Sequence, residues 1–181
     1  MDSEYVIKGA KPCEAKIYSD DEEIAEIKKG DGLTFKLISR DGREWTISNQ
    51  VHGEMRPFSI TVRQDQNKGK TDSTKGVLTI REHLFEYKDK FYMFTNHPEG
   101  RPWHQYLSGP VRYISRLDNF PYSDLAEVEH HIKHRLKRFR GVPVGEASGL
   151  GTHGHHVKVE KELEDIGLII AASSYLLYST G

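Results

Sequence analysis

The chain has 181 residues, which fits a single domain spanning 1–181 and is long enough to bury a sizeable core. Hydrophobic residues make up 36% of it and charged residues 29%, with a formal net charge of −1 at pH 7. A chain this close to neutral is not an electrostatic nucleic-acid binder as a whole, so a charged partner must bind a local patch.

The first residues and the cysteine content bear on the cellular compartment. The single cysteine, Cys13, excludes an internal disulfide and favours a reducing compartment. The start, Met1 to Glu4, is polar and acidic, unlike a signal peptide, and Asp2 excludes N-myristoylation. We therefore expect a cytoplasmic protein.

Alternation of apolar and polar residues predicts that most of the chain folds as short antiparallel strands. The runs 33–37 and 44–48 flank the step Asp41-Gly42, and an Asp-Gly step between alternating runs indicates a hairpin. A second turn is expected at 88–90. Further strand candidates occupy 58–63, 78–80, 85–87, 91–94, 111–117 and 157–159. Such strands turn one face to a core and the other to water.

Two stretches are interpreted as loops. Residues 64–76 hold no apolar side chain and are expected to form a mobile loop within the domain. Residues 96–110 hold three prolines and two glycines, with a short strand expected near Tyr106.

Residues 123–140 are predicted to form an amphipathic surface helix. Ser123 can cap its start, and cations in its last turn suit the helix dipole before Gly141 ends it. An apolar stripe at helical spacing, expected to dock the helix on the rest of the fold, consists of Leu125, Val128, Ile132, Leu136 and Phe139.

The run Ile166–Tyr178 carries no charge, and a helix through it would be apolar nearly all the way round. Such a helix is buried in a core, and this run is shorter than the roughly 20 residues that cross a bilayer. We expect the strands to wrap it. The alternative is a membrane-inserting tail.

Two stretches, 78–94 and 156–177, resemble the LURP-one-related and phospholipid-scramblase-like proteins, which share the tubby C-terminal fold. The first is similar to a basic strand that ends in a Leu-Phe step and returns through an aromatic strand. The second resembles the family's last strand, which closes the barrel, followed by a short acidic segment and the C-terminal hydrophobic helix. The resemblance covers about 33–95 and 142–178. It leaves the helix at 123–140 outside the family pattern.

The resemblance implies a mainly β (α+β) fold, a closed antiparallel β-barrel of about a dozen strands around a buried C-terminal helix. It also implies binding of phosphoinositides, which tubby proteins hold through basic residues on the barrel wall. Scramblase-like lipid transfer is a further alternative. However, the acidic residues between 160 and 165 do not reproduce the ligand spacing of a calcium loop, and a cysteine cluster for acylation is missing.

A cluster of cations is the main candidate binding site. Five cations fall within eight residues that hold no acid: Lys133, Arg135, Lys137, Arg138 and Arg140. A basic amphipathic helix binds anionic lipid surfaces, with about 1 kcal/mol per cation near the surface. A solvated helix face explains the same pattern, and both interpretations stay open.

Histidines form two clusters among the ten in the chain, at 130–134 and 153–156. His153, His155 and His156 are the alternative metal ligands, and an enzyme or metalloprotein using them is the alternative function. Zinc needs three or four ligands, and neither run brings a cysteine or carboxylate at ligand spacing. Solvated surface histidines are the other interpretation.

The sequence Gly149-Leu-Gly-Thr-His-Gly154 matches a dinucleotide-binding pattern. That fingerprint requires a helix after the glycines, and here a strand follows, which favours a hairpin connection. The residues show no catalytic triad or phosphate cradle. We therefore predict a non-catalytic binding or scaffold domain without a cofactor. Its partner would be an anionic membrane surface, at which it would be peripheral, or another protein.

Overall fold

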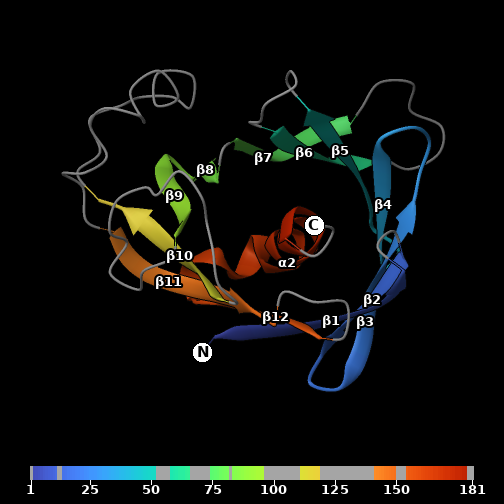
Figure 1. Ribbon diagram of the computed structural model, residues 1–181, viewed down its shortest axis with the longest axis horizontal. Coiled ribbons are helices and arrows are strands. Elements are labelled where there is room, and N and C mark those ends of the chain that lie inside the picture. The colour runs from blue at the N-terminus through green and yellow to red at the C-terminus, as the bar shows by residue number, and fades with distance from the viewer. Residues whose placement is uncertain are drawn as a thin grey trace.

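The computed structural model describes residues 2–11, 14–51, 58–65, 74–81, 83–95, 111–118, 141–149 and 154–178. Within these residues, twelve strands form a closed antiparallel barrel (Figure 1). Each strand pairs with its neighbours in the sequence, and β12 closes the barrel against β1. The predicted fold class, a barrel of about a dozen strands around a C-terminal helix, is confirmed.

The strands run in order around the barrel wall. They are β1 (Ser3–Lys11), β2 (Glu14–Ser19), β3 (Glu22–Lys29), β4 (Thr34–Ser39), β5 (Glu44–Val51), β6 (Phe58–Asp65), β7 (Thr74–Arg81), β8 (Leu84–Tyr87), β9 (Lys90–Thr95), β10 (Val111–Leu117), β11 (Gly141–Ser148) and β12 (His155–Val159).

Tight turns join several of these strands. The expected Asp41-Gly42 hairpin connects β4 to β5, and Gly42 takes a φ of 92° that a side chain would disfavour. The expected turn at Lys88 and Asp89 connects β8 to β9 with positive φ at both residues, as a two-residue type I′ hairpin loop requires.

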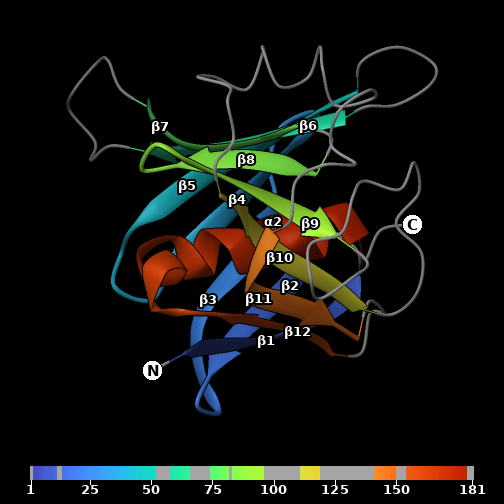
Figure 2. The same cartoon turned by 90° about the vertical axis from the view of Figure 1, so that its left-hand side faces the viewer.

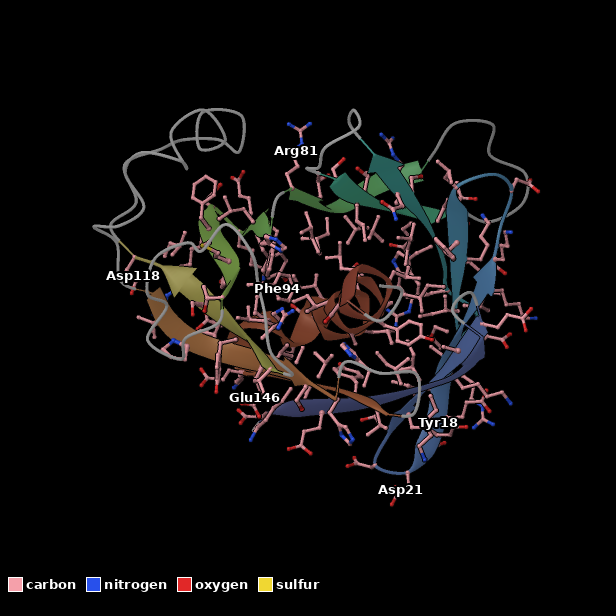
Figure 3. The ribbon with its side chains drawn as sticks, in the orientation of Figure 1. Tyr18, Asp21, Arg81, Phe94, Asp118 and Glu146 are labelled. Carbon is pink, nitrogen blue, oxygen red and sulfur yellow. The ribbon has the colours of Figure 1, made fainter. Side chains whose placement is uncertain are left out.

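The C-terminal helix fills the barrel. A 3₁₀ turn, η2 (Lys161–Ile166), leads into α2 (Gly167–Tyr178), and α2 runs through the interior (Figures 1 and 2). Residues on every side of α2 are buried, including Ile170, Ala171 and Tyr175 at 0% exposure. Inward-facing strand residues, such as Phe94, pack around it in one core cluster (Figure 3). The prediction of a helix buried on all sides is confirmed.

The barrel has two ends because successive strands alternate in direction. We call the end where α2 begins the entry mouth. The turns at Asp20–Asp21, Asp41–Gly42 and Lys88–Asp89 lie there, as does Glu160 after β12. The end of β10 and the start of β11 also lie at the entry mouth, since Leu117 pairs with Gly141.

The prediction of one loop over 64–76 is wrong at both ends. β6 continues to Asp65 and β7 begins at Thr74, with Asp65 paired to Thr74. Polar residues extend the strands here because backbone pairing does not need apolar side chains. The Asp65 carboxylate also accepts hydrogen bonds from Lys36 Nζ, at 2.6 Å, and from Thr46 Oγ1, at 2.8 Å.

Other sequence expectations lie outside the described residues. These are the helix at 123–140, the short strand near Tyr106 and residues 66–73 of the expected loop.

Candidate functional site

A pocket of about 320 Å³ opens at the entry mouth, between the start of α2 and strands β1, β3, β4 and β5. Its apolar side is formed by Tyr5, Ile24, Trp45, Leu168 and Ile169. Its charged rim is formed by Arg40, Asp41, Arg43, Glu164 and Asp165. A site of this composition can hold a small amphipathic group or a peptide side chain, since apolar surface and charges of both signs meet there.

Asp41 organises one edge of the pocket. Its Oδ1 accepts a hydrogen bond from Ser39 Oγ at 2.6 Å and one from the Arg43 backbone N–H at 3.1 Å. These bonds, the Ser39 hydroxyl first, lower the pKa of the Asp41 carboxyl. Arg43 Nε also donates to Asp41 Oδ2 at 2.8 Å, and its guanidinium lies 5.1 Å from the Trp45 ring centre. Arg43 is thus held against an aromatic ring.

Tyr5, which lines the pocket, lies against Gly167 at the start of α2. A Cβ on Gly167 would lie 2.6 Å from Tyr5 Oη, so only glycine allows this approach of α2 to β1. Burial raises the pKa of Tyr5, and the nearby Glu164 carboxylate adds to the rise. Tyr5 is therefore a neutral wall of the pocket at physiological pH.

Glu162 joins η2 to the barrel wall at β9 and β10. Its Oε2 accepts a hydrogen bond from Tyr92 Oη at 2.9 Å, and its Oε1 accepts one from Arg116 Nη1. Arg116 also donates from Nε to Asp118 Oδ1 at 2.7 Å. Burial, followed by the Glu162 bond, raises the pKa of Tyr92. The start of the helix is held by this network on β9 and β10.

At the other end of α2, a histidine lies inside the barrel. His155 is 0% exposed, and its Nε2 lies 2.9 Å from Ser174 Oγ on α2. Burial, with a smaller effect of His156, lowers the pKa of His155 to about 4. A serine beside a histidine can form a nucleophile and base, but both residues here are fully buried, so no substrate reaches them.

The structure separates the histidines proposed as metal ligands. His155 points into the barrel and His156, the next residue of β12, is exposed on the outside. Neighbouring strand residues point to opposite faces, so these two side chains cannot share a metal ion. His153 lies outside the described residues. The interpretation of these histidines as solvated is wrong for His155, because its inward position on β12 places it in the core.

Within the described ranges, no group of three His, Cys, Asp or Glu side chains converges as metal ligands. No helix in this part of the chain is long and apolar enough to cross a membrane.

The five basic candidates, Lys133, Arg135, Lys137, Arg138 and Arg140, lie outside the described residues. The structure does fix where their segment is attached. It leaves the barrel after Asp118 and returns at Gly141, at the entry mouth and between adjacent strands.

The glycine-rich run 149–154 connects β11 to β12, as expected of a hairpin connection. A Cβ on Gly149, whose φ is +66°, would lie 2.2 Å from the Gly154 carbonyl oxygen. The glycine at 149 is therefore explained by a close backbone approach, and the segment is followed by a strand, unlike a phosphate-binding loop.

Sequence reasoning missed the entry-mouth pocket. Its walls come from residues far apart in the chain, such as Tyr5, Trp45 and Leu168, which only the closed barrel brings together. One local signal was available, since Arg40 and Arg43 flank the predicted Asp41-Gly42 turn and turns lie at the ends of a barrel.

The chain matches no protein-family model, no curated protein and no solved structure.

Proposed function

We propose that this chain is a non-catalytic binding module of the LURP-one-related and scramblase-like kind, which acts at anionic, phosphoinositide-containing membrane surfaces. The observation that carries the proposal is the filled barrel. Its interior is occupied by α2, and Ile170, Ala172 and Tyr175 are 0% exposed. Within the described residues, binding must therefore use the outside of the barrel and its connections.

The position of the basic segment supports the membrane part of this proposal. Five cations within 133–140 belong to the connection between β10 and β11. Around that point the described turns and strand ends of the entry mouth are mainly acidic. The acids there include Asp2, Asp20, Asp21, Glu22, Asp41, Glu44, Asp65, Asp89, Asp118, Glu160, Glu164 and Asp165, and the cations include Arg40, Arg43, Lys88, Lys90 and Lys161.

This charge distribution favours one orientation on a membrane. An acidic entry mouth is repelled by an anionic surface, while the cations of 133–140 are attracted to it. The barrel would therefore approach the bilayer with the β10–β11 connection foremost and with the acidic turns at Asp20–Asp21 and Asp41 turned away.

A second candidate function is binding of a protein partner at the entry-mouth pocket. The apolar wall of Trp45 and Leu168 beside the rim of Arg40 and Glu164 suits a peptide side chain with a polar end. This candidate does not require the basic segment.

Co-sedimentation with vesicles tests the membrane proposal. The purified chain is spun with phosphatidylcholine vesicles and with vesicles that also contain phosphatidylserine and phosphoinositide, at low and high salt. We expect binding only to the anionic vesicles and loss of it at high salt, because screening weakens exposed charge interactions.

Two charge variants make the test specific. One replaces Lys133, Arg135, Lys137, Arg138 and Arg140 by glutamine. The control removes the same charge from the barrel, at the exposed residues Lys8, Lys16, Lys28, Lys29 and Lys88. The proposal requires that the first variant loses vesicle binding and the control keeps it. Equal loss in both would indicate a net-charge effect, and unchanged binding in the first would refute the membrane site.

A further inference from the structure

The cations on the rim of the entry-mouth pocket are already paired with acids. Arg43 donates from Nε to Asp41 Oδ2 at 2.8 Å, and its guanidinium lies 5.1 Å from the Trp45 ring centre. Arg40 Nη1 lies 3.7 Å from Glu22 Oε1. Both described cations of the rim therefore have an acidic partner on the barrel itself.

The acids that η2 contributes to the rim are less fully paired. Within the described part of the chain, the Glu164 carboxylate makes no ion pair or hydrogen bond. Asp165 Oδ2 lies 3.6 Å from Lys88 Nζ, but these side chains are 71% and 69% exposed, and water screens so exposed a pair. Burial, with an addition from the Glu164 charge, raises the pKa of Tyr5, which places that carboxylate beside the apolar side of the pocket.

An apolar wall lies between the two charged edges. Trp45 and Ile169 are 3% and 4% exposed, and Ile24 and Leu168 are half-buried. The pocket volume of about 320 Å³ is at the lower end of the roughly 300–1,000 Å³ of ligand pockets. It therefore suits one long side chain whose aliphatic stem packs on the wall while its charged head stays at the rim.

We propose that the pocket binds an arginine side chain from a basic segment of a protein partner. Its guanidinium would pair with Glu164 and Asp165, and its stem would pack on Leu168. Arginine fits better than lysine, because its planar head forms paired hydrogen bonds to a carboxylate and stacks on aromatic rings. The chain's own Arg43 already makes such an aromatic contact with Trp45.

The competing occupant is an acidic side chain bound by Arg40 and Arg43. It would have to displace Glu22 and Asp41 from these arginines. The entry mouth also opposes it, because its described turns and strand ends are mainly acidic. Such a field attracts a basic segment and repels an acidic one.

The inference rests on the second candidate function, binding of a protein partner at the pocket, and is independent of membrane binding. It adds the charge of the partner and the side chain that enters. An entry mouth turned away from an anionic bilayer would remain accessible to such a partner.

Tryptophan fluorescence tests the proposal with Trp45 as the reporter. The chain holds two tryptophans, so Trp103→Phe leaves only the one in the pocket. This protein is titrated at low salt with a hexa-arginine peptide and with a hexaglutamate peptide. A third peptide of the same length contains an arginine analogue whose guanidinium is attached directly to Cβ. It matches the charge of hexa-arginine but has too short a stem to cover the apolar wall.

Two variants with the same loss of charge locate the binding. Glu164→Gln with Asp165→Asn neutralises the acids of the pocket. Asp20→Asn with Asp21→Asn neutralises the β2–β3 turn, which lies at the same mouth but outside the pocket lining. Asparagine tolerates the positive φ of 52° and 62° at these two positions, so the turn is kept.

We expect hexa-arginine to change the Trp45 emission saturably and to bind at least about tenfold more tightly than the short-stem peptide. The pocket variant should bind hexa-arginine at least about tenfold more weakly than the unchanged rim. The turn variant should lose less than about threefold, because exposed charges away from the site are screened.

Equal binding of the long and short stems, or equal loss in the two variants, would show attraction to the acidic mouth alone and would overturn the proposal. A response to hexaglutamate alone would also overturn it, while leaving the pocket as a peptide site. No response of Trp45 to any peptide would overturn both the proposal and the second candidate function. Since no lipid is present, each outcome is separate from that of the vesicle test.

Discussion

His155 on β12 and Ser174 on α2 are joined inside the barrel, with Nε2 and Oγ 2.9 Å apart. The edge of the His155 ring also faces Tyr175, with ring centres 6.0 Å apart. This contact ties the second half of α2 to the wall with a titratable group that water does not reach. The stability of the barrel should therefore depend on the charge of one histidine.

We predict that the free energy of unfolding falls as the pH is lowered through the range from about 6.5 to about 4. The folded-state pKa of His155 is depressed, so the unfolded chain binds more protons in this range and gains stability from them. The contribution of neutral His155 is complete above pH 6.5. A shift of this size corresponds to about 3 kcal/mol. Urea denaturation at several pH values measures it.

The matched variants are His155→Gln and His156→Gln. The first removes the buried titrating group and should flatten the pH dependence below 6.5. The second replaces an exposed histidine on the same strand and should leave the slope in place. An unchanged slope in His155→Gln would show that other groups cause the acid sensitivity.

Gly167→Ala should destabilise the protein although alanine is the better helix former by about 1 kcal/mol. The new Cβ would lie 2.6 Å from Tyr5 Oη and 3.0 Å from Tyr5 Cε2, so α2 or β1 must move. Overpacking of this kind costs about 1–3 kcal/mol. Thermal unfolding checks it, and a Tyr5→Leu background should remove most of the loss. A stabilised Gly167→Ala protein would contradict the close packing of α2 on β1.

Glu162→Ala should lower the free energy of unfolding by about 1–3 kcal/mol, because it leaves the buried Tyr92 and the half-buried Arg116 without their acceptor on η2. The exposed neighbour Glu160 is the control, and Glu160→Ala should change stability by less than about 0.5 kcal/mol. A double-mutant cycle with Tyr92→Phe measures the coupling. Additive losses would show that the Tyr92 hydrogen bond contributes nothing.

Local patterns predicted those parts of the fold that depend on local chemistry. The Asp41-Gly42 step predicted one hairpin, and the uncharged run ending at Tyr178 predicted the buried helix. The predicted number of strands and the predicted closure of the barrel came from the family resemblance. No local pattern in residues 3–29 indicated that β1 would pair with β12.

The features that were missed depend on which face of a strand turns inward. On β10 the alternation of Val111, Tyr113 and Leu117 marked a strand correctly, but Ile114 is the residue in the core. Leu117, on the other face of β10, is buried as well, so apolar residues occur on both faces and their alternation does not show which face turns inward. His155 alternates along β12 with the buried Val157 and Val159, and this alternation could have predicted that its side chain points into the barrel.

α2 forms the core of this barrel, since its residues Ile170, Ala171 and Tyr175 are fully buried among the strands. The direct test compares the full chain with a chain ending at Glu160, by near-ultraviolet circular dichroism and urea denaturation without detergent. We predict that the shorter chain lacks a cooperative transition and aggregates, because residues such as Ile7, Phe94 and Val157 lose the helix they pack around. A truncated chain that stays folded and unfolds with the same midpoint would show that the barrel does not need α2 as its core.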